Sequence, residues 1–255
     1  MPGKKRKRYR LRPRFFVITG TALILLLSGI LLLVRSCSGE PPVSPPESAS
    51  SGSAQSSDTP SENNSRYLSE ILFTGDSRTR GLVTYGFVPS RQVLAVDGLN
   101  HRDARKKELF DSEDGVQRTL AAVVGEREAK RVMISFGING MDFISEEDYF
   151  TEYEALIDEL MAQSPQSSYL LQAIYPVSSV FSEQNPNMSN ETIDRYNQKL
   201  RELAEEKGIF FLNTAEALKD AGGALGEAYD AGDGLHMSRE AYKVIVRYIR
   251  EHPAP

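Results

Sequence analysis

The stretch ILFTGDS at residues 71–77 decides the fold of this chain. Its first four residues form a short apolar run that ends at Gly75, a pattern typical of a strand buried on both faces. Asp76 and Ser77 follow directly. Because ligands of open α/β sheets gather at the carboxyl ends of the strands, this segment places a serine where chemistry is expected. We also expect Ser77 to begin a helix.

Further apolar runs repeat this pattern along the chain. They lie at residues 93–96, 131–136, 168–174 and 209–212. Helical patterns lie between or after them, at residues 116–124, 146–161, 192–207 and 238–250. Ser145 is placed to cap the second of these helices at its start, and Gly208 to cap the third at its end. The alternation predicts an α/β fold: a three-layer α/β/α sandwich around a mainly five-stranded parallel sheet of the flavodoxin-like type.

The N-terminal quarter of the chain has a different composition. Residues 1–14 carry eight Lys or Arg, and residues 15–34 contain no charged side chain. Twenty helical residues span roughly 30 Å, the thickness of a bilayer core. By the positive-inside rule we expect a cytoplasmic tail, then a transmembrane helix, with the rest outside. A cleaved signal peptide, or a lipoprotein modified at Cys37, would be the alternatives.

The following segment, residues 35–65, is rich in Ser, Pro, Glu and Asn. It has almost nothing apolar to bury, so we expect a disordered linker. Residues 66–255 then form the folded domain. That domain has 21 basic and 31 acidic residues, a net charge of about -10. Such a charge argues against nucleic acid as a partner, because nucleic-acid binding needs a basic surface.

Three more polar motifs fall at the expected carboxyl rim of the sheet. Gly98 follows the second strand, and Gly137-Ile138-Asn139 follows the third. The motif at residues 233–236, Asp-Gly-Leu-His, precedes the last helix. Each motif alone is common, but together, in this order and at strand ends, they predict one site.

This combination resembles the SGNH, or GDSL-like, serine hydrolase family in its membrane-anchored bacterial form. The resemblance implies that Ser77 is the nucleophile, with His236 as base and Asp233 as the residue that orients it. It also implies an oxyanion hole from the backbone N–H of Ser77, the N–H of Gly98 and the side-chain amide of Asn139. Asp76 would organise the nucleophile loop.

The sequence differs from the commoner sequence motifs of the family at two positions. Arg78 stands where the family name has leucine, and Gly140 follows Asn139 where an aspartate is common. The first change leaves the nucleophile intact, and the second affects a supporting contact near the oxyanion hole. No cofactor and no metal is expected, and Asp97, His101 and Asp103 are interpreted as a charged loop. His101 itself is interpreted as a solvated loop residue, with a substrate contact as the alternative.

The expected activity is ester hydrolysis through an acyl-serine intermediate. An outward-facing domain on a tether meets cell-wall and surface polysaccharides, so the expected substrate is an O-acetylated glycan. An O-acetyltransferase of the same fold, a lysophospholipase or thioesterase, and a non-catalytic glycan-binding protein remain as alternatives.

Overall fold

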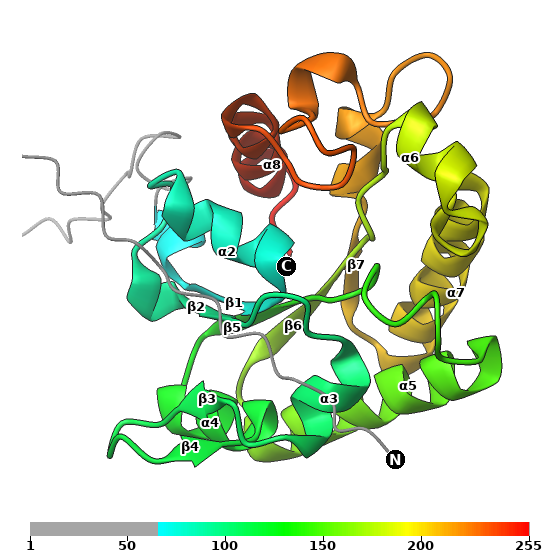
Figure 1. The fold of residues 1–255 in the computed structure, drawn as a ribbon. Helices are drawn as coiled ribbons and strands as arrows, with labels where there is room; N and C mark the ends of the chain where they lie inside the picture. Colours follow the sequence, from blue (N-terminus) through cyan, green and yellow to red (C-terminus); the bar gives the residue numbers. More distant parts are fainter. Residues whose placement is uncertain (1–65, 255) are drawn as a thin grey trace, which may run out of the picture. The chain divides into compact units, whose positions relative to one another are not determined.

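The computed structural model describes residues 66–254, which form a parallel sheet between two layers of helices (Figure 1). The strands of this sheet are β1 (Ile71–Gly75), β2 (Val93–Ala95), β5 (Arg131–Ser135), β6 (Ser168–Gln172) and β7 (Phe210–Leu212). Their order is β2-β1-β5-β6-β7, and every neighbouring pair is parallel. The predicted α/β/α architecture with a five-stranded parallel sheet is therefore confirmed.

Both faces of the sheet are apolar, as the continuous hydrophobic runs predicted. In β1, Leu72 packs into one core cluster, whereas Ile71 and Phe73 pack into the other. In β5, Ile134 packs into the first cluster and Met133 into the second. Because successive side chains of a strand point to opposite faces, each strand contributes to both cores.

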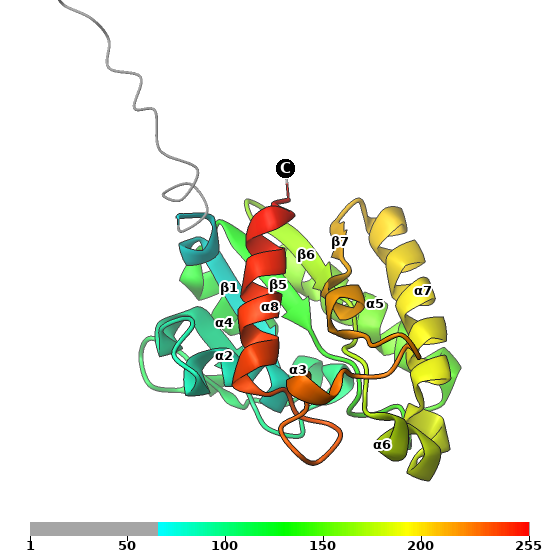
Figure 2. The same ribbon diagram turned by 90° about the horizontal axis from the view of Figure 1, so that it is seen from above.

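Helices cover the two faces in separate groups (Figures 1 and 2). The first core is covered by α3 (His101–Lys106), α4 (Leu120–Arg127), α5 (Glu146–Gln163) and α7 (Asn190–Lys207). The second is covered by α2 (Ser77–Thr84) and α8 (Arg239–Glu251). The remaining helical turns are α6 (Ser179–Gln184), η1 (Ser90–Gln92), η2 (Pro186–Met188), η3 (Thr214–Leu218) and η4 (Glu227–Tyr229).

The predicted helix caps are confirmed. The side chain of Ser145 accepts a hydrogen bond from the Asp148 N–H at 3.2 Å and so begins α5. Gly208 ends α7. Ser238, predicted as part of the last helix, is the N-cap of α8 and accepts from the Ala241 N–H at 3.3 Å.

The prediction of a helix at residues 116–124 was partly wrong. Its start belongs to a small antiparallel hairpin of β3 (Phe110–Asp111) and β4 (Gln117–Arg118), and the helix α4 begins at Leu120. The hairpin strands have two residues each. So short a strand leaves no hydrophobic periodicity that a sequence pattern could show.

The predicted tail, transmembrane helix and linker, at residues 1–65, lie outside the described residues. Within residues 66–254, no helix combines the length and the apolar character that crossing a bilayer requires.

Candidate active site

Ser77 lies at the carboxyl end of β1 and is the first residue of α2. Asp76 caps this helix, because its side chain accepts a hydrogen bond from the Arg78 N–H at 2.9 Å. The first N–H groups of a helix have no partner within the helix, and the helix dipole adds positive potential there. Ser77 therefore lies in an environment suited to a developing negative charge.

The three residues predicted as a triad meet in space. The Oγ of Ser77 is 3.0 Å from Nε2 of His236, although the two residues are 159 positions apart. Nδ1 of His236 is 2.6 Å from Oδ2 of Asp233. Since a carboxylate accepts hydrogen bonds, Nδ1 carries the proton and Nε2 is free to accept from the serine hydroxyl. This is the arrangement that a general base needs.

Asp233 is held by the backbone of its own loop. Its Oδ1 accepts from the N–H groups of Leu235 at 2.9 Å and His236 at 2.7 Å. Partial burial would raise the pKa of Asp233, but hydrogen bonds from the His236 backbone and ring outweigh this and lower its pKa to about 2. Asp233 is therefore ionised whenever His236 can act as a base.

A second set of contacts fixes the position of the same loop. The Ser178 N–H donates to the Gly234 carbonyl at 2.9 Å, which joins the loop to the segment after β6. Gly234 has a φ of +76°, and a Cβ there would overlap the Ser178 side chain. Both observations require glycine at this position.

The two other predicted oxyanion donors follow β2 and β5, the strands on either side of β1. The segment that carries Gly98 is tied to α2 by an ion pair between Arg80 and Asp97 at 2.6 Å. Asn139 follows β5, and its Nδ2 is 2.8 Å from Oδ2 of Asp76. The same Nδ2 is 3.4 Å from the carbonyl of Leu99, the residue after Gly98. The structure thus brings both segments to the loop that begins at Asp76.

The candidate site is open to solvent. The side chains of His236 and Asp233 are 42% and 55% exposed, respectively. Ser77 is half-buried. A polymer could approach such a site without entering a tunnel.

The prediction that His101 is a solvated loop residue was wrong. Its side chain is completely buried, at the start of α3. The ring stacks on Tyr153 with centroids 4.7 Å apart and meets Tyr149 edge-on at 4.3 Å. Burial lowers the pKa of His101 to about 4, so the ring is neutral and serves as core packing.

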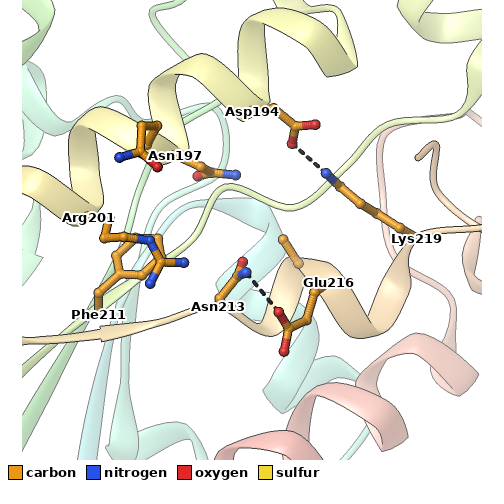
Figure 3. Close-up of a pocket in the computed structure, with 9 residues that line it drawn as sticks. Asp194, Asn197, Arg201, Phe211, Asn213, Glu216 and Lys219 are labelled. Carbon is orange, nitrogen blue, oxygen red and sulfur yellow. Dashed lines mark hydrogen bonds and ion pairs between the residues drawn. The ribbon is translucent and has the colours of Figure 1, made fainter.

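A cavity of about 170 Å³ lies away from the catalytic residues, between α7, β7 and η3 (Figure 3). Its charged side chains are largely paired: Lys219 contacts Asp194 at 2.5 Å, and Asn213 donates to Glu216 at 3.0 Å. None of the predicted site residues lines it. The candidate site is therefore assigned by geometry, not by cavity size.

Sequence reasoning missed the buried polar groups behind Ser77. Arg78 is 5% exposed, and its Nη1 donates to the Tyr175 carbonyl at 3.0 Å. The available signal was that Arg78 stands where the family motif has leucine, but the sequence does not show that the Arg78 side chain is buried. In the described residues, no group of three or more His, Cys, Asp or Glu is arranged to hold a metal ion.

Comparisons with known proteins identify the family of the chain. The model of the GDSL-like lipase/acylhydrolase family matches residues 73–244. No curated protein matches the sequence.

Among solved structures, a GDSL-like lipase from Bacteroides thetaiotaomicron is 17% identical with a TM-score of 0.56, over 74% of this chain and 96% of that one. A protein from Streptococcus pneumonia is 20% identical with the same TM-score, over 75% and 91%. A catalytic mutant of an acetylxylan esterase from Geobacillus stearothermophilus is 20% identical with a TM-score of 0.50, over 71% and 92%. These likenesses show the fold.

Proposed function

The chain belongs to the GDSL-like lipase/acylhydrolase family and is a serine hydrolase acting on carboxylic esters, and from this premise we propose that it removes O-acetyl groups from carbohydrate. The observation that carries the catalytic part is the chain of contacts from Ser77 Oγ to His236 at 3.0 Å and from His236 to Asp233 at 2.6 Å.

In the proposed reaction, His236 Nε2 takes the proton from the Ser77 hydroxyl as its Oγ attacks the ester carbonyl. The Ser77 N–H, the Gly98 N–H and the Asn139 amide stabilise the negative charge on the carbonyl oxygen. The protonated His236, stabilised by the Asp233 carboxylate, then gives its proton to the sugar oxygen as the bond between that oxygen and the acyl carbon breaks, and the sugar leaves as an alcohol. Water attacks the acetyl-serine in a second round, and acetate leaves as Ser77 regains its proton.

Two observations support a carbohydrate ester as the substrate. The exposure of His236 and Asp233 leaves room for a bulky alcohol portion of the ester. One structural neighbour is described as an acetylxylan esterase. An acetyl group is also the acyl portion that needs the least enclosed space.

The activity test uses the purified full chain with 4-nitrophenyl acetate, butyrate and octanoate, beside O-acetylated xylan and O-acetylated peptidoglycan. We expect acetate release that declines as the acyl chain lengthens. Ser77→Ala and His236→Ala should each lower kcat about 10³-fold or more, because nucleophile and base act as a unit. Ser168→Ala, an exposed serine at the amino end of β6, is the matched control and should keep full activity.

Equal rates in the wild type and both active-site variants would contradict the esterase mechanism. A preference for octanoate would contradict the acetyl substrate and favour a lipase or thioesterase. Acetyl transfer to an added sugar in place of acetate release would indicate an O-acetyltransferase.

The domain is further proposed to act outside the cell, on a membrane anchor at residues 15–34. The support is the uncharged run of twenty residues that follows eight basic ones. In bacterial cells expressing the full chain, we expect it in the membrane fraction, with residues 66–255 degraded by protease added to intact spheroplasts. Protection of the domain in intact spheroplasts would contradict this orientation, and recovery in the soluble fraction would contradict the anchor.

A further inference from the structure

Two buried groups that no step of the proposed reaction uses lie directly behind the nucleophile. Asp76 is 2% exposed and Arg78 is 5% exposed, one on each side of Ser77 in the sequence. Burying a charged group is costly unless its interactions compensate. The contacts of these two residues therefore indicate what they do.

Asp76 uses both of its carboxylate oxygens. Oδ1 accepts from the Arg78 N–H at 2.9 Å, which is the helix cap. Oδ2 accepts from Nδ2 of Asn139 at 2.8 Å. Capping needs a single oxygen, and asparagine caps helices as well as aspartate does. The cap alone thus does not explain a charged residue here, but the contact with Asn139 does.

A carboxylate determines which way the Asn139 amide faces. The amide nitrogen has two N–H groups, whereas the amide oxygen can only accept. Beside the Asp76 carboxylate, the nitrogen is attracted and the oxygen would be repelled. One N–H then points to Asp76, and the other makes only a long hydrogen bond of 3.4 Å to the Leu99 carbonyl, a weak contact that an oxyanion would replace. That second N–H is the donor that an oxyanion hole requires.

We propose that Asp76 is a positioning residue, whose carboxylate fixes the Asn139 amide with its nitrogen toward the oxyanion, and that the buried charge of Arg78 keeps this carboxylate ionised. The inference rests on the proposed esterase function and adds two residues to its machinery. Neither residue touches the substrate.

Arg78 has the position and the charge for this role. Its Nη1 donates to the Tyr175 carbonyl at 3.0 Å, while its Nε and Nη2 have no partner among the described residues. Arg78 and Asp76 both line a cavity of about 10 Å³. Within residues 66–254, the guanidinium thus hydrogen-bonds to one carbonyl only. Its positive charge acts on the Asp76 carboxylate through the low-dielectric interior, where charges interact strongly.

Burial raises the pKa of Asp76, and the positive charge of Arg78 is the largest of the effects that oppose the rise. The Arg78 N–H, Asn139 and His236 also oppose it. The other titratable groups that face Asp76 are four tyrosines from α5, α8 and the segment after β6, and burial raises the pKa of each, so they stay uncharged: Tyr149, Tyr153, Tyr175 and Tyr242. Arg78 is therefore the permanent positive charge that faces Asp76.

The first test is a double-mutant cycle of Asp76→Asn and Asn139→Ala in the full chain, assayed with 4-nitrophenyl acetate. Asp76→Asn keeps the cap and the volume, but it presents an amide nitrogen to Asn139 and so turns the Asn139 oxygen inward. We expect each single variant to lower kcat about 10²-fold with little change in KM, as for the loss of one oxyanion donor. The double variant should be no slower than Asn139→Ala alone.

A second test holds even where Asp76→Asn folds poorly. Arg78→Met removes the charge at similar volume, and Arg78→Lys keeps it. We expect the acid limb of the kcat/KM profile to move to higher pH in Arg78→Met and to stay near its wild-type position in Arg78→Lys.

The results that would overturn this inference differ from the result that would overturn the proposed function. Multiplicative losses in the cycle would mean that Asp76 and Asn139 act independently and would overturn the inference. A wild-type rate in Asp76→Asn, or identical pH profiles in the two Arg78 variants, would overturn it as well while leaving the esterase function intact. No ester hydrolysis by the wild-type chain would overturn the proposed function and this inference with it.

Discussion

At the scale of single residues, the members of the candidate site could be predicted because each belongs to a local motif. Ser77 follows a strand, and Asp233 and His236 are three positions apart on one loop. The structure places their side chains within hydrogen-bonding distance. The contact between Asp76 and Asn139 could not be predicted in the same way. It joins residues 63 positions apart and depends on how β1 and β5 align.

His101 shows the same limit. Its neighbours in the sequence are charged, which favoured a solvated loop, but its environment comes from α5, 48 residues away. Nε2 of His101 contacts the Tyr149 carbonyl at 2.9 Å, whereas the buried Nδ1 has no partner among the described residues. A proton added to Nδ1 would have nowhere to donate.

This histidine predicts a stability that depends on pH. Burial lowers its pKa in the folded protein to about 4, from 6.5. Between these values the unfolded chain binds more protons, so the stabilisation is fully present above about pH 6.5 and is lost as the pH falls toward 4. Across this pH range, His101 changes the free energy of unfolding by about 3 kcal/mol.

The measurement is the free energy of unfolding by urea at pH 4.5 and pH 7, for the wild type and for His101→Phe, which keeps an aromatic ring between the tyrosines. We expect a clearly smaller difference between the two pH values in the variant. Equal differences would show that other groups cause the pH dependence.

At the scale of elements, α2 and α8 pack closely against each other beside Ser77. A Cβ on Gly81 of α2 would overlap the ring and hydroxyl of Tyr242 of α8. The Tyr242 hydroxyl donates to the Arg78 carbonyl at 2.5 Å. The glycine thus permits the contact that ties the nucleophile helix to α8.

Gly81→Ala should therefore destabilise the protein by about 1–3 kcal/mol through overpacking, although alanine favours helices. In the background of Tyr242→Ala the same change should be neutral or stabilising by up to about 1 kcal/mol, because the obstacle is gone and helix propensity remains. Chemical denaturation of the four proteins in this cycle measures the coupling. Equal effects of Gly81→Ala in both backgrounds would disprove the close contact.

The elements that sequence reasoning recovered are those with long hydrophobic patterns. The five sheet strands, α5, α7 and α8 all bury a continuous face or stripe. The hairpin β3–β4 and the six-residue helices α3 and α6 were missed. Too few of their residues are buried to repeat a period, so tertiary contacts determine their form.

At the scale of the whole folded domain, the two ends of the described chain meet. The Ala254 N–H donates to the Tyr67 hydroxyl at 2.8 Å, and both residues are buried. The Arg131 guanidinium lies 4.6 Å from the centre of the Tyr67 ring and also pairs with Glu70 at 2.5 Å. These contacts join the segment before β1 to the start of β5, at the amino edge of the sheet.

The position of this junction has a consequence for the direction from which substrate arrives. The candidate active site lies at the carboxyl edge of a parallel sheet, whereas the chain enters at its amino edge with Arg66. A tag, a fusion partner or a solid support joined at Arg66 would thus lie at the amino edge of the sheet and leave the carboxyl edge unobstructed. Immobilised through that end, the protein would present Ser77 toward the surrounding solution, where a large substrate could reach it.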